Sequence, residues 1–303
     1  MRKFYLIFVL MLAFNSGAQF TPQYNSYMFN GLSINPAYTG MRECLSVLGL
    51  HSSQWVGFDG APTSDYLTLH TPLNNKHAIG LNLFNDRLGV QNQTGIFPSY
   101  AYHLKIAKKQ KLSFGVSAGV NFFTVQNSHV STLTEDKVFA ENKKTSSLPN
   151  IGAGLYYSSS RFYAGFSIPT LFSSEFSNVA AYSAFHMNPK GINLIFTSGG
   201  IVKLKNNLVW KPSILIKAIT AGIFQMDLNS NVYFNEKLNI GASYRIKDAI
   251  VGMLGYRFTE QFDVAYSYAF PLSTIVRASS GSHEILLRFE LRKKVETFNP
   301  RYF

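Results

Sequence analysis

The sequence predicts an all-β fold, a transmembrane antiparallel β-barrel of about 14 strands with an N-terminal plug-like segment. Three observations predict it. The chain of 303 residues is 46% hydrophobic and 15% aromatic, yet beyond residue 18 no apolar run approaches the about 18 residues of a helical membrane span. Apolar residues alternate instead with small or polar ones over segments of about ten residues. Turn residues separate these segments at alternately short and long intervals.

Residues 1–18 are interpreted as a secretory signal peptide. A basic pair precedes an apolar run over residues 4–14, and Ser16 and Ala18 occupy the −3 and −1 positions of a cleavage site. The apolar run is shorter than the about 20 residues of a membrane-spanning helix, so an uncleaved anchor is the weaker interpretation. The mature chain is expected to begin at Gln19. Loss of the two basic leader residues takes the formal charge from +12 to +10.

Residues 19–43 are expected to form a periplasmic or plug segment. Its stretch QYNSYMFNGLSINPAYTG includes Tyr24, Tyr27, Met28 and Phe29, which together are too apolar to lie free in water. A position in the barrel mouth or lumen is favoured over contact with a neighbouring periplasmic subunit, because barrel lumens are commonly plugged or filled by side chains. An ordinary N-terminal extension is the third alternative, and it would be open to proteases.

Residues 44–291 are expected to form the outer-membrane barrel. In LSFGVSAGVNFF, which begins at Leu112, every second residue is apolar and those between are mostly Ser, Gly or Asn, so one strand face suits lipid and the other a polar lumen. A soluble β-sandwich shares the alternation but would have polar outer faces. The candidate strands lie near residues 44–54, 64–73, 77–85, 96–106, 111–125, 150–158, 161–169, 191–204, 208–219, 223–234, 238–247, 249–258, 261–270 and 282–291.

The connections between these candidate strands alternate in length. Long loops face the exterior and short turns the periplasm in this architecture, so both termini are expected on the periplasmic side, with residues 292–303 as a C-terminal tail. The short connections are 74–76, 107–110, 159–160, 206–207, 235–237 and 259–260, and the long ones include 126–149, 170–190 and 271–281.

No motif predicts catalysis, cofactor binding or a metal site, and the protein is expected not to be an enzyme. The seven histidines are scattered, without an HExxH helix, a GxSxG elbow or a Cys/His cluster. A Ser/His pair assembled from different strands, as in a barrel lipase, is a weak alternative. A single cysteine excludes an intramolecular disulfide. The basic residues are dispersed, so no nucleic-acid partner is expected.

The stretch QWVGFDGAPTS predicts a loop that contains two aromatic residues in need of burial or a binding partner. Asp59 begins a turn dipeptide with Gly60, whereas Trp55 and Phe58 have no structural reason to lie in water. We expect the two aromatic residues to close over the lumen as a lid, with contact to a partner as the alternative.

A lumen pair is predicted from the hairpin around residue 236. If that residue is the centre of the turn, Asp227 lies opposite Arg245 on the inner face. A register slip of one residue would carry Arg245 to the lipid, where a charge costs about 2–4 kcal/mol at the midplane. The pair is expected to be structural rather than catalytic.

Five stretches occur in a recognisable order along nearly the whole mature chain: QYNSYMFNGLSINPAYTG, QWVGFDGAPTS, KPSILIK, DLNSNVYFNEKLNIGASYR and GSHEILLRFEL. Together they resemble the PorP/SprF family of the type IX secretion system. The resemblance implies a bacterial outer-membrane barrel that works with the secretion and gliding machinery to deliver or anchor partner proteins at the cell surface. The implied partners are an exported protein with a C-terminal sorting domain, periplasmic or outer-membrane subunits of the machinery, and outer-membrane lipid. No cofactor is implied.

The alternative function is an outer-membrane transporter or porin for small or hydrophobic solutes. General porins commonly need 16 to 18 strands to leave an aqueous channel. A barrel of about 14 strands with Tyr156 and Tyr163 on its inner face is expected to be obstructed. The sequence therefore favours a protein-interaction barrel, and conductance in a planar bilayer would separate the two functions.

Overall fold

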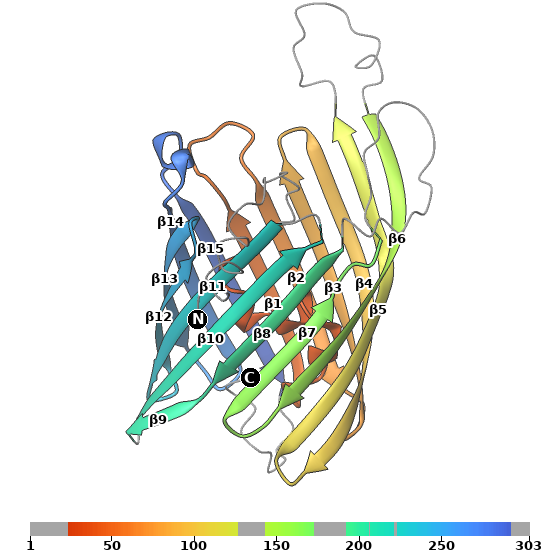
Figure 1. The fold of residues 1–303 in the computed structure, drawn as a ribbon, viewed down its shortest axis with the longest axis vertical. Helices are drawn as coiled ribbons and strands as arrows, with labels where there is room; N and C mark the ends of the chain where they lie inside the picture. Colours follow the sequence, from red (N-terminus) through yellow and green to blue (C-terminus); the bar gives the residue numbers. More distant parts are fainter. Residues whose placement is uncertain (1–23, 127–142, 173–191, 206, 221–222, 292–303) are drawn as a thin grey trace, which may run out of the picture.

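The structure is a computed structural model that describes residues 24–126, 143–172, 192–205, 207–220 and 223–291. These residues form a closed antiparallel β-barrel (Figure 1). The expected signal peptide and C-terminal tail lie outside them. The strands are β1 (Leu45–Ser53), β2 (Thr63–Pro72), β3 (His77–Leu88), β4 (Gln91–Ala107), β5 (Gln110–Gln126), β6 (Lys143–Ser158), β7 (Phe162–Ile168), β8 (Asn193–Gly200), β9 (Val202–Lys205), β10 (Leu208–Ile219), β11 (Ile223–Phe234), β12 (Leu238–Arg245), β13 (Ala249–Arg257), β14 (Phe262–Pro271) and β15 (Ser282–Leu291).

The barrel has 14 strand positions, the number that the sequence predicts. β1 pairs with β15, and β10 with β11, so the sheet has no open end. β8 and β9 both pair with β10 and share one position, interrupted at Ile201. The backbone N–H of Ile201 still donates to the Arg161 carbonyl at 2.8 Å. Closure matters because an open edge would leave unpaired backbone groups in lipid.

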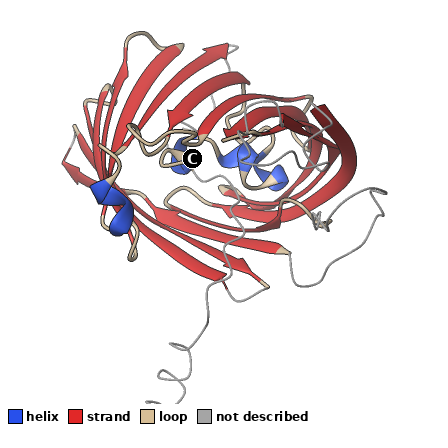
Figure 2. Ribbon diagram, turned by 90° about the horizontal axis from the view of Figure 1, so that it is seen from above, coloured by secondary structure: helices blue, strands red, loops and turns tan. Residues whose placement is uncertain are grey.

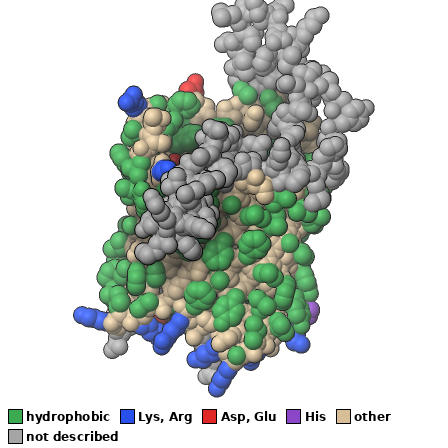
Figure 3. All heavy atoms as spheres, viewed as in Figure 1, with side chains coloured by type: hydrophobic (Ala, Val, Ile, Leu, Met, Phe, Trp, Pro, Cys, Tyr) green, Lys and Arg blue, Asp and Glu red, His purple; other side chains and the backbone are tan. Residues whose placement is uncertain are grey.

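The outer wall of the barrel is apolar. On β5, Phe114 and Val116 are 44% and 53% exposed, whereas Ser113 between β4 and β6 is fully buried on the inner side. Figure 3 shows apolar side chains over the visible wall, with Lys and Arg gathered at the short-turn rim. This is the outward apolar band of an outer-membrane barrel, and it excludes the soluble sandwich. No helix in the described ranges is long and apolar enough to cross a membrane.

Four consecutive strands, β3 to β6, are longer than predicted. β4 begins at Gln91 and β6 at Lys143, so residues 143–149 of the predicted loop 126–149 are strand, and that prediction is wrong there. Residues 144–149 lack the apolar alternation of a lipid-facing strand, which is why the sequence indicated a loop. Backbone pairing with β5 orders them instead, with Pro149 opposite Val120.

The first residues that the structure describes, 24–44, occupy the barrel interior. They form three short 3₁₀ helices, η1 (Tyr27–Phe29), η2 (Gly31–Ser33) and η3 (Pro36–Tyr38), and Figure 2 shows short helices inside the ring of strands. η3 contacts β4, β5 and β6. A fourth short helix, η7 (Thr274–Arg277), lies in the loop between β14 and β15.

Candidate functional site

Residues 24–44, called here the lumenal segment, are the main contents of the described lumen. Local chemistry sets its conformation: the side chain of Asn35 accepts a hydrogen bond from the Ala37 N–H at 2.9 Å, and Pro36 opens η3. Both residues suit the start of a helix. Ala37 and Thr39 are fully buried, so the segment is packed between the walls.

Glu284 on β15 holds the start of the lumenal segment. Its two carboxylate oxygens accept the backbone N–H groups of Asn25 and Ser26, each at 2.8 Å. Glu284 is 1% exposed. Hydrogen bonds to an ionised acceptor are about twice as strong as neutral ones, so this inward carboxylate supplies a strong anchor that sequence analysis missed. The available signal was an acidic residue on the inward face of HEILLRFEL.

Asn35 anchors the middle of the segment on the opposite wall. Its amide donates to the Leu155 carbonyl of β6 at 3.0 Å, and Ser167 on β7 donates to the Ile34 carbonyl at 2.6 Å. Gly115 makes the seat for η3, because an added Cβ there would lie 2.1 Å from the Ala37 nitrogen. An inward side chain at this position would collide with the backbone of the segment.

The end of the segment is tied to the wall at the short-turn end. Arg42 Nε lies 2.6 Å from Glu290 Oε1, and Lys111 pairs with Glu43. Gly40 has a φ of +76°, and its N–H donates to His70 at 3.1 Å. The segment is therefore bonded to strands around the barrel, with no single side carrying all the contacts.

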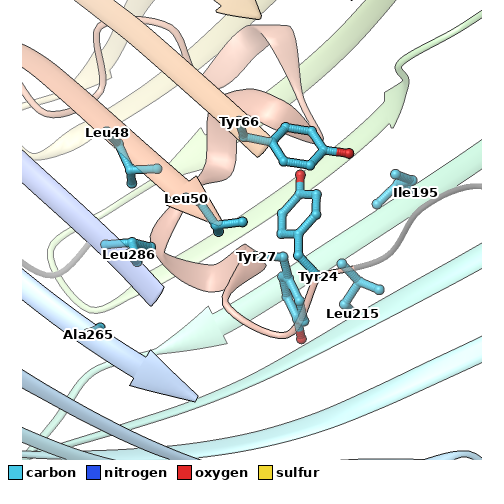
Figure 4. Close-up of a cluster of buried hydrophobic side chains, with 9 residues drawn as sticks. All are labelled: Tyr24, Tyr27, Leu48, Leu50, Tyr66, Ile195, Leu215, Ala265 and Leu286. Carbon is cyan, nitrogen blue, oxygen red and sulfur yellow. The ribbon is translucent and has the colours of Figure 1, made fainter. Parts of the chain in front are cut away.

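Aromatic packing joins the segment to the barrel core (Figure 4). The rings of Tyr24 and Tyr66 are tilted, with centroids 4.8 Å apart. Burial raises the pKa of the Tyr24 hydroxyl, which stays protonated and donates to Ser33. Tyr27 is buried, and the half-buried Met28 and Phe29 pack against the same cluster. The cluster consists of Tyr24, Tyr27, Leu48, Leu50, Tyr66, Ile195, Leu215, Ala265 and Leu286.

The structure places Asp227 opposite Arg245, in the register that the sequence predicts for β11 and β12. Arg245 Nε and Asp227 Oδ2 are 3.4 Å apart, and both side chains face inward with less than a tenth of their surface exposed. Arg245 also donates to the Asn25 side chain at 3.1 Å. This second contact, which links the pair to the lumenal segment, was not anticipated.

The loop that carries Trp55, Phe58 and Asp59 pairs with the loop before β15. The Val56 N–H donates to the Gly281 carbonyl, and the Ser280 N–H to the Val56 carbonyl, both at 2.8 Å. Trp55 is half-buried, whereas Phe58 is 48% exposed and Asp59 is exposed. Phe58 therefore lies exposed at the long-loop end and does not close over the lumen.

The described residues were expected to hold no metal site and no disulfide. Among them no group of three or more His, Cys, Asp or Glu side chains could hold a metal ion. Cys44, the single cysteine of the chain, is buried. The contacts described above are packing contacts and hydrogen bonds between the lumenal segment and the barrel wall.

Comparison with known proteins gives one family and several distant structures. A family model described as "Type IX secretion system membrane protein PorP/SprF" matches residues 16–289. No curated protein matches. Similar solved structures include Omp33 of Acinetobacter baumannii (TM-score 0.49, 8% identity, 82% of this chain and 98% of that one). The Ralstonia pickettii toluene transporter TbuX gives a TM-score of 0.49 with 12% identity over 91% of this chain and 95% of its own.

Proposed function

Because the chain belongs to the PorP/SprF family of type IX secretion system membrane proteins, we propose that it delivers partner proteins bearing a C-terminal sorting domain to the cell surface, or anchors them there. The protein is an outer-membrane barrel of this system. The finer proposal concerns its partners: an exported protein at the long-loop end, and subunits of the secretion machinery at the periplasmic end.

The occupied lumen carries this proposal. The lumenal segment is hydrogen-bonded to β15 through Glu284 and to β6 through Asn35, on separate parts of the wall. We propose that residues 19–43 act as a plug. A plugged barrel offers its loops and rims for recognition, and loops on a rigid scaffold usually carry that role.

Phe58 is the side chain that we propose for contact with the exported protein. It is 48% exposed on a loop whose backbone is fixed by pairing with residues 280 and 281. A large aromatic side chain on a fixed loop loses little conformational entropy on binding, and such residues are enriched at binding hot spots.

Affinity purification tests the proposal. The tagged full chain is purified from its own outer membrane and bound proteins are identified by mass spectrometry. We expect an exported protein with a C-terminal sorting domain to copurify, and Phe58→Ala to reduce its recovery. Phe258→Ala is the matched control, because Phe258 is 62% exposed in a short turn at the opposite rim. Absence of any exported protein from the unaltered sample would contradict the proposal.

Planar-bilayer conductance tests the alternative. A plugged barrel is expected to show no steady large conductance. A steady large conductance of the unaltered chain would favour the transporter for small or hydrophobic solutes.

A further inference from the structure

A cluster of buried and half-buried charges lies in the lumen at the short-turn end. Arg42 pairs with Glu290 at 2.6 Å, and Arg257 Nε lies 2.7 Å from Asp263 Oδ1. Arg288 lies 3.8 Å from the second oxygen of Asp263 and also donates to the Phe29 carbonyl. Three guanidinium groups thus share two carboxylates.

Lys211 adds a fourth cation to this cluster. It lies on β10 three residues after the strand begins at Leu208, and it is only 5% exposed. No described residue forms a hydrogen bond or an ion pair with its ammonium group. Four cations and two carboxylates leave a formal excess of +2. Buried charge is costly unless it is paired, so the two carboxylates do not balance the positive charge of the cluster and an added anion would lower its excess.

A small cavity adjoins the Lys211 side chain. Its volume is about 40 Å³, and three of the arginines in the cluster line it together with Lys211 and Asn239. The turn residues Glu236 and Lys237 also line it, so it reaches the short-turn mouth. A cavity of roughly 10–15 Å³ is the smallest that holds one water molecule. The space therefore fits a carboxylate group and the atoms next to it, and the remainder of a ligand would extend toward the short-turn mouth.

Asn239 supplies the complementary acceptor. Its side-chain oxygen is buried and has no hydrogen-bond partner among the described residues, while its amide nitrogen donates to Asn231 at 3.4 Å. A bare anion would leave this oxygen unsatisfied. A ligand with an N–H group close to its carboxylate satisfies both Lys211 and Asn239.

We propose that this cavity binds the carboxylate of an N-acylated amino acid, with the carboxylate at Lys211 and the adjacent N–H at Asn239. The ligand enters from the periplasmic mouth. The same chemistry occurs at the C-terminus of a polypeptide and in a free N-acyl amino acid. This site lies at the opposite end of the barrel from Phe58 and does not depend on the proposed partner contact.

Fluorine NMR of the detergent-solubilised full chain tests the site, with N-trifluoroacetylglycine as the probe. We expect saturable broadening of the probe signal. Lys211→Met is expected to weaken binding by about tenfold or more, since a hydrogen bond to a charged group is lost. Lys217→Met is the matched control: it removes the same charge from the same face of β10, outside the residues that line the cavity. Asn239→Ala is expected to weaken binding by a smaller factor.

The probe's neutral analogue tests the charge requirement on the unaltered chain. N-trifluoroacetylglycinamide is expected not to bind, and this comparison holds even if a variant fails to fold. A trifluoroacetylated tripeptide ending in glycine separates the sources: binding as tight as the short probe favours a polypeptide terminus, and loss of binding favours a free acid. Equal binding of the acid and the amide, no saturable binding up to about 10 mM, or unchanged binding in folded Lys211→Met would overturn the proposal.

Discussion

Replacing Glu284 with glutamine is expected to release the start of the lumenal segment. The glutamate carboxylate accepts two backbone N–H groups, from Asn25 and Ser26, at 2.8 Å each. Glutamine has nearly the same shape but only one acceptor oxygen, so its NH₂ group would face one of the two N–H donors. The substitution therefore removes an interaction while leaving the volume of the side chain almost unchanged.

The magnitude follows from those two bonds. Losing one hydrogen bond to a charged acceptor costs about 1.5–3 kcal/mol, and changing the other from charged to neutral costs about 1 kcal/mol more. The docking free energy of the segment is then weakened by about 2.5–4 kcal/mol. At 1.4 kcal/mol per tenfold, this corresponds to a roughly 60- to 700-fold shift in the docking equilibrium.

Hydrogen exchange measured by mass spectrometry reads this equilibrium directly. In the refolded full chain, the peptide that contains Asn25 and Ser26 is expected to exchange at least about 60 times faster in Glu284→Gln. Glu260→Gln, in an exposed turn, is the control and should exchange like the unaltered chain. If Glu284→Gln changed the exchange rate by less than about twofold, Glu284 would not be the anchor inferred here.

Three further variants test separate parts of the structure. Gly115→Val places a Cβ 2.1 Å from the Ala37 nitrogen, so proteases should trim the lumenal segment in outer-membrane vesicles. Gly49→Val is the control and should resist trimming, because a Cβ added at residue 49 meets no neighbouring side chain or strand within 4 Å. Equal trimming of the two variants would show that Gly115 is not the seat of η3. Asp227→Asn removes the more buried of the two carboxylates that pair with Arg245, the other being Asp248 at 3.2 Å. It should lower the free energy of barrel unfolding in urea by about 2 kcal/mol, whereas a loss below about 1 kcal/mol would show that the pair is not structural. Phe58→Ala should leave that unfolding free energy unchanged but reduce partner recovery, and unchanged recovery would remove its proposed role.

The fold was largely predictable because lipid imposes a simple rule. A strand in a barrel wall needs apolar residues outward at every second position, so the alternation in the sequence locates β10 and β11 at the bounds that the structure has. The rule does not apply to strand residues that do not face lipid. Residues 144–149 of β6 pair with β5 without that alternation, and they were mistaken for loop.

The contents of the lumen were only partly predictable. The apolar character of Tyr24 indicates that this side chain needs burial. Glu284 alternates with the outward apolar residues of its own strand, which indicates that it points inward. Closure of the barrel decides which inward residue contacts which part of the segment. Asn25 and Glu284, for example, are 259 positions apart in the sequence. The role of Gly115 as a seat was likewise hidden, since an inward glycine in a strand is also compatible with a merely narrow lumen.

Quantitative mass spectrometry of surface, periplasmic and medium fractions tests the central claim most directly, in cells with and without this protein. Partner anchoring predicts a selective defect: one exported protein, or a small set, is lost from the surface and accumulates in the periplasm or the medium, while other exported proteins are displayed normally. Restoring the full chain should restore that display. Normal display of every exported protein together with reduced uptake of a solute would contradict the account and support the transporter.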